Sequence, residues 1–201
     1  MASIYDVKPQ FQALLRPLTN WLARRGVTAN QVTSAAAVMS IAAGMLVYVW
    51  RDRPAVMLTL PVVLFVRMAL NAIDGMLARE HDQKSRLGAI LNELGDVISD
   101  SALYLPLALV AGFSPPLVVL VVLLAVLTEM TGVAAIQIGS SRRYEGPMGK
   151  SDRAFVFGAL GLALGLGLEP GPWLDWLFGL LALLLAWTIV NRARHALAEE
   201  A

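Results

Sequence analysis

The sequence contains no cysteine among its 201 residues. Disulfide bonds and a thiolate nucleophile are therefore excluded, and cysteine usage gives no indication of the redox compartment. Charged residues are also scarce, at 15% of the chain, against about 25% in an average soluble protein. The formal net charge is only +1, which argues against nucleic acid as a partner.

Apolar residues are in excess, at 57% of the chain with a mean hydropathy of +0.64. Soluble domains average roughly 45–50% apolar residues, so the composition indicates an all-α integral membrane protein. A helix of about 20 apolar residues crosses a bilayer. On this basis we expect one membrane domain over residues 1–201, with six transmembrane helices at 31–50, 55–78, 87–110, 114–138, 153–168 and 173–191. These six helices form a bundle over residues 31–193.

The basic residues are distributed unevenly about these six spans. Thirteen of the sixteen lysines and arginines fall on one side, and only Arg51 and Arg53 fall on the other. The remaining one, Arg67, lies inside the second span, where Asp100 and Glu129 are candidate ion-pair partners. Because cytoplasmic loops carry an excess of Lys and Arg, the pattern predicts that both termini are cytoplasmic.

An amphipathic segment at residues 5–25 precedes the first span. Its apolar residues recur at helical spacing: Phe11, Leu14, Leu15, Leu18, Trp21 and Leu22. Such a helix lies in the membrane interface or caps the bundle, and the pattern does not separate the two. Pro17 is expected to kink or divide it.

A polar cluster at residues 71–96 lies at the cytoplasmic ends of the second and third spans. Asn71 and Asp74 are three residues apart and Asn92 and Asp96 four apart, so each pair shares one helix face. A short polar loop joins the two spans, which makes them antiparallel neighbours whose polar faces can meet. Four oxygen-bearing side chains around one cleft suit a hard divalent cation such as Mg²⁺.

The spacing in this stretch resembles the signature of the CDP-alcohol phosphotransferase (CDP-alcohol phosphatidyltransferase) family, D-x-x-D-G-x-x-A-R, eight residues, then G-x-x-x-D-x-x-x-D. Six of the eight fixed positions are present in register: Asp74, Gly75, Ala78, Arg79, Gly88 and Asp96. The segment VTANQVT at 27–33, which includes Asn30, also resembles the family's TPN-x-x-T motif before its first span, with Ala29 in place of proline.

The resemblance implies a membrane transferase of phospholipid biosynthesis in the cell (inner) membrane, with its active site facing the cytoplasm. It would move a substituted phosphate, such as phosphatidyl from CDP-diacylglycerol or another CDP-alcohol, to an acceptor alcohol and release CMP. Membrane lipids, Mg²⁺ or Mn²⁺ and a homodimer are implied as well. Asp96 would be the general base and Asp74 a metal ligand. The nucleotide-binding residues would be Gly75, Ala78, Arg79, Gly88 and Asn30.

Two positions depart from the signature, because Asn71 and Asn92 stand where the family has aspartates. An amide oxygen can still ligate a metal but carries no charge. Either one metal binds, or a second binds weakly without substrate, or other carboxylates contribute. Glu93 and Asp100 are candidate additional ligands, and we expect Glu93 to compensate because it lies nearer the cytoplasmic end.

A basic loop lies between the fourth and fifth spans. Its cations are Arg142, Arg143, Lys150 and Arg153. They are candidates for binding a phosphate on the acceptor or lipid head groups, although the positive-inside rule explains the same charges without a site. Two other functions stay open: a catalytically weakened lipid- or nucleotide-binding membrane protein, and a small ion-coupled transporter.

Overall fold

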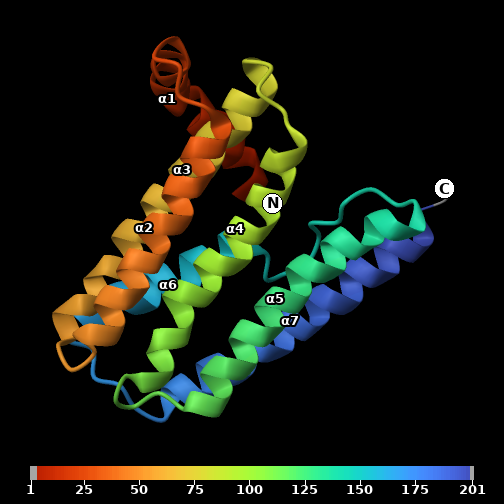
Figure 1. Ribbon diagram of the computed structural model, residues 1–201. Helices are drawn as coiled ribbons and strands as arrows, with labels where there is room; N and C mark the ends of the chain where they lie inside the picture. Colours follow the sequence, from red (N-terminus) through yellow and green to blue (C-terminus); the bar gives the residue numbers. More distant parts are fainter. Residues whose placement is uncertain (1–3, 200–201) are drawn as a thin grey trace.

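The computed structural model describes residues 4–199, and all regular structure within that range is helical (Figure 1). The ends of the predicted 1–201 domain, residues 1–3 and 200–201, lie outside the described residues. The α-helices are α1 (Ile4–Arg24), α2 (Ala29–Val49), α3 (Thr59–Glu80), α4 (Arg86–Tyr104), α5 (Pro115–Ala134), α6 (Lys150–Gly165) and α7 (Trp173–Ala198). Short 3₁₀ turns are η1 (Pro54–Leu58), η2 (Leu105–Leu109) and η3 (Ala135–Ile138).

A helix lies at each of the six predicted spans, but only four are long and apolar enough to cross a membrane. Those four are α2, α3 together with η1, α5 together with η3, and α7. The helix α4 fails on composition, because it carries the acidic residues Glu93, Asp96 and Asp100. The helix α6 has only 16 residues. It begins three residues earlier than expected because the Asp152 carboxylate accepts a hydrogen bond from the Gly149 N–H, 3.0 Å away, and so caps its first turn.

Within the bundle, each α-helix packs mainly against one or two other helices (Figure 1). The helix α2 contacts both α3 and α4, α3 contacts α6, α4 contacts α5, and α5 lies along α7. The approach of α2 to α4 is close at Gly44, where a Cβ atom would lie only 1.9 Å from the Ala102 carbonyl oxygen. Only glycine permits this backbone contact. Deeper in the bundle, Tyr104 of α4 stacks on Phe157 of α6, with ring centroids 3.8 Å apart.

The predicted amphipathic segment forms α1, which packs against the end of α3 and the start of α2. Leu15 and Leu22 contact a small core cluster built from these two helices, whereas Leu14 and Trp21 are exposed. The helix continues through Pro17, so of the two expected outcomes, a kink or a division, the division does not occur.

Candidate active site

The polar faces of α3 and α4 meet, as the spacing predicted. The Asn71 amide donates a hydrogen bond to Asp96 Oδ1, 3.2 Å away, across the two helices. The Asp74 carboxylate lies within electrostatic range of Asp96, and the two aspartates are only 6% and 5% exposed. Asn92 lies one turn before Asp96 on α4 and is half-buried. Two carboxylates and their amide neighbours therefore surround one polar site.

The start of α2 forms the third wall of this site. The Thr33 hydroxyl donates a hydrogen bond to Asp74 Oδ2, 2.7 Å away. Thr33 ends the VTANQVT segment that carries part of the resemblance, but its contact with Asp74 could not be predicted from the sequence. A capping box between Thr28 and Gln31 starts α2 at this point and so fixes the position of Thr33.

The nucleotide-binding candidates form two groups. On α4, a Cβ atom on Gly88 would lie 2.7 Å from Asn30 Oδ1 and 2.9 Å from Ser85 Oγ. Ser85 caps α4 by accepting a hydrogen bond from the Gly88 N–H at 2.9 Å. Asn30 and Gly88, which are 58 positions apart in the sequence, are therefore adjacent.

The second group lies on α3. The Arg79 guanidinium folds back over Gly75, where a Cβ atom would lie 3.0 Å from its Nη2 atom. Arg79 is otherwise exposed, so its planar group is accessible to a phosphate. Ala78 packs beside the cluster that joins α3 to α2. The Gln83 side chain accepts a hydrogen bond from the Ala29 N–H at 2.7 Å and ties the α3–α4 loop to α2.

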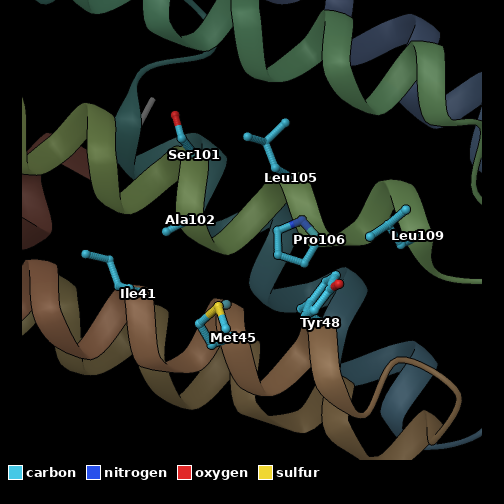
Figure 2. A pocket seen from close by; sticks show the side chains of 9 residues that line it. Ile41, Met45, Tyr48, Ser101, Ala102, Leu105, Pro106 and Leu109 are labelled. Atoms are coloured by element: carbon cyan, nitrogen blue, oxygen red, sulfur yellow. The ribbon is translucent and has the colours of Figure 1, made fainter.

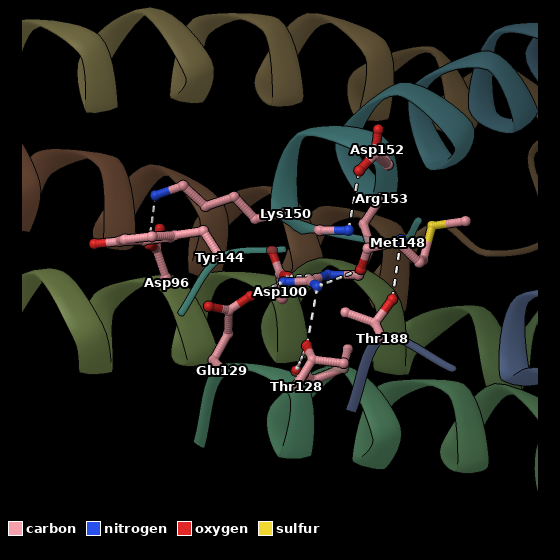
Figure 3. Close-up of polar contacts among 12 residues, drawn as sticks. Asp96, Asp100, Thr128, Glu129, Tyr144, Met148, Lys150, Asp152, Arg153 and Thr188 are labelled. Carbon is pink, nitrogen blue, oxygen red and sulfur yellow. Dashed lines mark hydrogen bonds and ion pairs between the residues drawn. The ribbon is translucent and has the colours of Figure 1, made fainter. Parts of the chain in front are cut away.

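Lys150, the first residue of α6, reaches into the site (Figure 3). Its ammonium group lies 2.6 Å from Asp96 Oδ2, and it is also within electrostatic range of Asp74. Lys150 is a candidate for binding the acceptor, and its partner in the structure is the candidate general base.

Asp100 is engaged in a buried ion-pair network. Arg67 donates to its Oδ1 atom, and Arg153 donates to its Oδ2 atom at 2.8 Å. The pairing of Arg67 with Asp100 is thus confirmed, and Arg67 also contacts Asp96 Oδ1 at 3.2 Å. Because both oxygens of Asp100 are held by arginines and the residue is 4% exposed, the structure does not support it as a metal ligand.

Arg153 lies in the same network and is only 1% exposed. Besides Asp100, it contacts Glu129 at 3.0 Å (Figure 3). This burial and the pairing with two carboxylates do not support the expectation that Arg153 binds the acceptor. Its contacts join α6 to Asp100 of α4 and Glu129 of α5.

The other two basic candidates also have acidic partners. Arg142 binds both oxygens of Glu93 at 2.6 Å each and Glu129 at 3.0 Å. Glu93 therefore neutralises an arginine, and the expectation that it replaces a lost metal ligand is not supported. Arg143 contacts the carboxylate of Glu199 at 2.8 Å, just after α7.

The candidate donor set for a cation consists of two carboxylates and the amides beside them. Within residues 4–199 no group of three or more His, Cys, Asp or Glu side chains converges as a metal site would. Asp74 nevertheless lies one turn after Asn71, whose amide contacts Asp96, and the Asp96 carboxylate already pairs with one cation, the Lys150 ammonium. Carboxylate and amide oxygens are the ligands that Mg²⁺ and similar cations use.

An apolar groove lies farther along α2 and α4, beyond the polar site (Figure 2). Its volume is about 340 Å³. It is lined by Ile41, Met45 and Tyr48 from α2 and by Leu105 and Leu109 from η2, just after α4. A polar site and an apolar groove thus share the same pair of helices.

Comparison with known proteins gives one family. Residues 26–190 match the model of the CDP-alcohol phosphatidyltransferase family. The chain is 49% identical over 195 residues to the inner membrane protein YnbA of Escherichia coli (strain K12), covering 97% of this chain and 96% of that protein.

Solved structures of phosphatidylinositol phosphate synthase (PgsA1) from Mycobacterium tuberculosis have the same fold. The form with CDP-DAG bound has a TM-score of 0.72 at 22% identity, covering 90% of this chain and 92% of that one. The complex with manganese and citrate has a TM-score of 0.73 at 23% identity, covering 90% and 87%. At this identity the match establishes the fold.

Proposed function

Because the chain belongs to the CDP-alcohol phosphatidyltransferase family, a family of membrane transferases of phospholipid biosynthesis, we propose that it transfers phosphatidyl from CDP-diacylglycerol to an acceptor alcohol. The observation that carries the proposal is the convergence of Asp74 and Asp96 beside the Asn30–Gly88 contact. In this arrangement the carboxylates that would bind a cation lie next to Asn30 and Gly88, a surface that a nucleotide can approach closely because glycine has no side chain.

In the proposed reaction the acceptor oxygen attacks the phosphorus of the phosphatidyl group. The phosphoanhydride bond to CMP breaks, and CMP leaves with the bonding electron pair. Asp96 accepts the proton of the acceptor hydroxyl as general base, a role worth about 10²–10⁴ in rate. Gly75, Ala78, Gly88 and Asn30 line the nucleotide site, and Arg79 binds a phosphate oxygen.

A divalent cation is part of the proposal. Asp74 and Asp96, with the amide oxygens of Asn71 and Asn92, would hold it. Mg²⁺ or Mn²⁺ in such a site neutralises charge on the diphosphate and orients it for in-line displacement. The PgsA1 complex with manganese is consistent with this choice of metal.

We propose CDP-diacylglycerol rather than a water-soluble CDP-alcohol as donor because of the apolar groove along α2 and α4. Its lining of Ile41, Met45, Leu105 and Leu109 suits an acyl chain. An acyl chain in the groove would leave the cytidine diphosphate at the polar end of the same helices. The PgsA1 structure with CDP-DAG bound supports this class of donor.

The acceptor alcohol is proposed to carry a phosphate or another anionic group. Of the four basic candidates, Lys150 retains the most favourable position, since it lies beside the proposed base, whereas Arg143 is paired with Glu199. Arg142 and Arg153 are engaged with Glu93, Glu129 and Asp100. We propose that these ion pairs stabilise the helices around the site and do not contact the substrates.

For the membrane arrangement, we propose a single domain with six spans, including α4 and α6, in the cell inner membrane. Both termini and the polar site face the cytoplasm, with α1 lying in the interface. The exposed Leu14 and Trp21 suit contact with lipid. A homodimer is proposed from the family resemblance.

The test is a transfer assay with the purified protein, CDP-diacylglycerol, Mg²⁺ and a panel of acceptors: glycerol phosphate, inositol phosphate, serine, glycerol and polar lipids. We expect metal-dependent release of CMP matched by formation of a lipid product. Asp96→Asn should lower the rate at least about 100-fold, and the exposed Asp175→Asn on α7 serves as the matched control. Donor binding without CMP release would favour a binding protein, and an ion flux in liposomes would favour a transporter.

A further inference from the structure

We infer that Lys150 is a built-in cation that takes the place of one of the two divalent metals a four-aspartate site would hold, so this chain uses a single metal. The inference rests on the proposed function of the site. It concerns the number of metals and the role of one lysine, neither of which the family match specifies.

The contact geometry places the Lys150 charge where a metal would otherwise bind. Its Nζ atom is 2.6 Å from Asp96 Oδ2, and Asp74 lies within electrostatic range of it. The other Asp96 oxygen accepts hydrogen bonds from Asn71 and Arg67 at 3.2 Å each. Among residues 4–199, the hydrogen-bond partners of the Asp96 carboxylate are thus three donors, and two of them, Lys150 and Arg67, are cations.

The position of Lys150 is fixed by the start of α6. Three residues later, Arg153 is anchored between Asp100 and Glu129 and is 1% exposed. The Asp152 carboxylate caps the first turn through the Gly149 N–H. Because Gly149 and Arg153 on either side of it are both held, the Lys150 backbone is held too. Its side chain remains 37% exposed and can change partners.

The charge balance favours one dication over two. The amides of Asn71 and Asn92 leave two carboxylates, Asp74 and Asp96, where the signature has four. The acids nearest in sequence that might replace them have other partners, since Glu93 binds Arg142 and Asp100 binds two arginines. Counting Asp74, Asp96 and Lys150, a single dication gives a net charge of +1, which the negative charge of the donor diphosphate offsets. A second dication would leave the site strongly positive, and like charges a few ångströms apart repel strongly at low dielectric.

The lysine also has a role when the donor binds. An ammonium group is a compact charge with three hydrogen-bond donors and binds phosphate oxygens well. Substrate binding would transfer Lys150 from Asp96 Oδ2 to a phosphate oxygen of the donor, on the side of the site where the anionic acceptor would also bind. This exchange would free Asp96 to accept the proton of the acceptor hydroxyl, so that the base becomes available only when substrate is present.

The experiment counts Mn²⁺ bound to the purified chain by electron paramagnetic resonance, with and without CDP. Wild type should bind one Mn²⁺ per chain in both conditions. The triple variant Lys150→Met, Asn71→Asp, Asn92→Asp should bind two, with the spin coupling expected of ions about 3.5–4 Å apart. The double variant Asn71→Asp, Asn92→Asp, which retains Lys150, should bind its second ion at least about tenfold more weakly than the triple variant, a difference of about 1.4 kcal/mol.

Single variants isolate the charge. Lys150→Met should raise the affinity for the first Mn²⁺ about tenfold, and Lys150→Arg should leave it unchanged. Lys84→Met is the matched control, because Lys84 is an exposed lysine in the α3–α4 loop, and it should change nothing. Elution volume and melting temperature verify that each variant is folded.

Several results would overturn the inference: two ions in wild type, no ion in wild type, equal second-ion affinity in the double and triple variants, or an equal gain from Lys84→Met. These readouts do not depend on turnover. Transfer activity with two bound ions would refute the role of Lys150 alone. One bound ion without any CMP release would refute the proposed reaction and leave the lysine's role standing.

Discussion

Glu93 and Arg142 form a bidentate ion pair, with both carboxylate oxygens 2.6 Å from guanidinium nitrogens. The pair joins α4 to the loop between η3 and α6, and Arg142 also contacts Glu129 on α5. Two parallel charge-assisted hydrogen bonds are among the stronger polar contacts in proteins. Glu93 is thus a structural link between three segments beside the proposed active site.

This relationship predicts the behaviour of Glu93→Gln. Loss of the carboxylate leaves Arg142 with one acidic partner, and the free energy of unfolding should fall by about 1–3 kcal/mol. The Mn²⁺ concentration that gives half-maximal CMP release should not change, since Glu93 does not hold the metal. Thermal unfolding and a metal titration measure the two effects, with the exposed Glu169→Gln as control. An altered metal requirement at unchanged stability would show that Glu93 is a ligand after all.

Arg153→Met tests whether this arginine is structural. The change leaves Asp100 and Glu129 buried with one fewer cation, and breaking such a pair costs about 3–5 kcal/mol. We expect a large loss of folded protein, measured as the yield of monodisperse protein in detergent. The KM for the acceptor should be unchanged in the fraction that folds. A raised KM for the acceptor at a normal yield of folded protein would instead indicate that Arg153 binds the acceptor.

Gly88→Ala tests the wall of the nucleotide pocket. The new methyl group would lie 2.7 Å from Asn30 Oδ1 and 2.9 Å from Ser85 Oγ, so both side chains must move. Because only the ends of two side chains shift, the melting temperature should change little, whereas the KM for the CDP-linked donor should rise about tenfold, the equivalent of one lost hydrogen bond. Gly179→Ala on α7 is the control, since its Cβ atom would meet nothing within 4 Å. An unchanged KM for the donor would contradict the proposal that Gly88 lines the nucleotide pocket.

The Glu199 carboxylate gives a prediction about pH. It accepts hydrogen bonds from Ser140 and Ser141 and contacts Arg143, and these partners lower its pKa from 4.5 to about 2. A depressed pKa means that the contact stabilises the fold fully above the unfolded-state pKa and loses its effect as the pH falls toward 2. The difference in melting temperature between wild type and Glu199→Gln should be constant from pH 7 to about pH 5 and shrink below pH 4.5.

A difference that instead grew at low pH would reverse the sign of this linkage. Glu169→Gln, in the loop before α7, removes the same charge without these partners and should show a smaller difference at every pH. Because Glu199 holds the loop that carries Arg143, the same variant should expose this loop to trypsin at neutral pH.

The sequence predicted the helices and the meeting of their polar faces because both depend on local patterns. Apolar runs set where the helices form, and the spacing of Asn71 and Asp74 put them on one face of α3. A short loop then brought that face to Asp96. The same reasoning could not establish membrane crossing for α4, since the acids that make the site also lower its hydropathy.

The ion-pair partners could not be predicted from local patterns. Lys150 meets Asp96 across 54 positions and Arg142 meets Glu93 across 49, so both pairs depend on how the loop after η3 folds back over the bundle. Thr33 was overlooked for a related reason, because a threonine at a helix start is ordinarily a capping or packing residue. Only the approach of α3 reveals its contact with Asp74.

The backbone contact between Gly44 and Ala102 means that the proposed activity would also require a glycine at a position that touches no substrate. Gly44 lies 14 positions after Asn30 on α2, about 20 Å along the helix axis, and Ala102 follows Gly88 by the same 14 positions on α4. Any larger residue at Gly44 would wedge the two helices apart at their far ends. Because Asn30 and Gly88 oppose each other on these same helices, the affinity for the proposed nucleotide would depend partly on the absence of a side chain at Gly44.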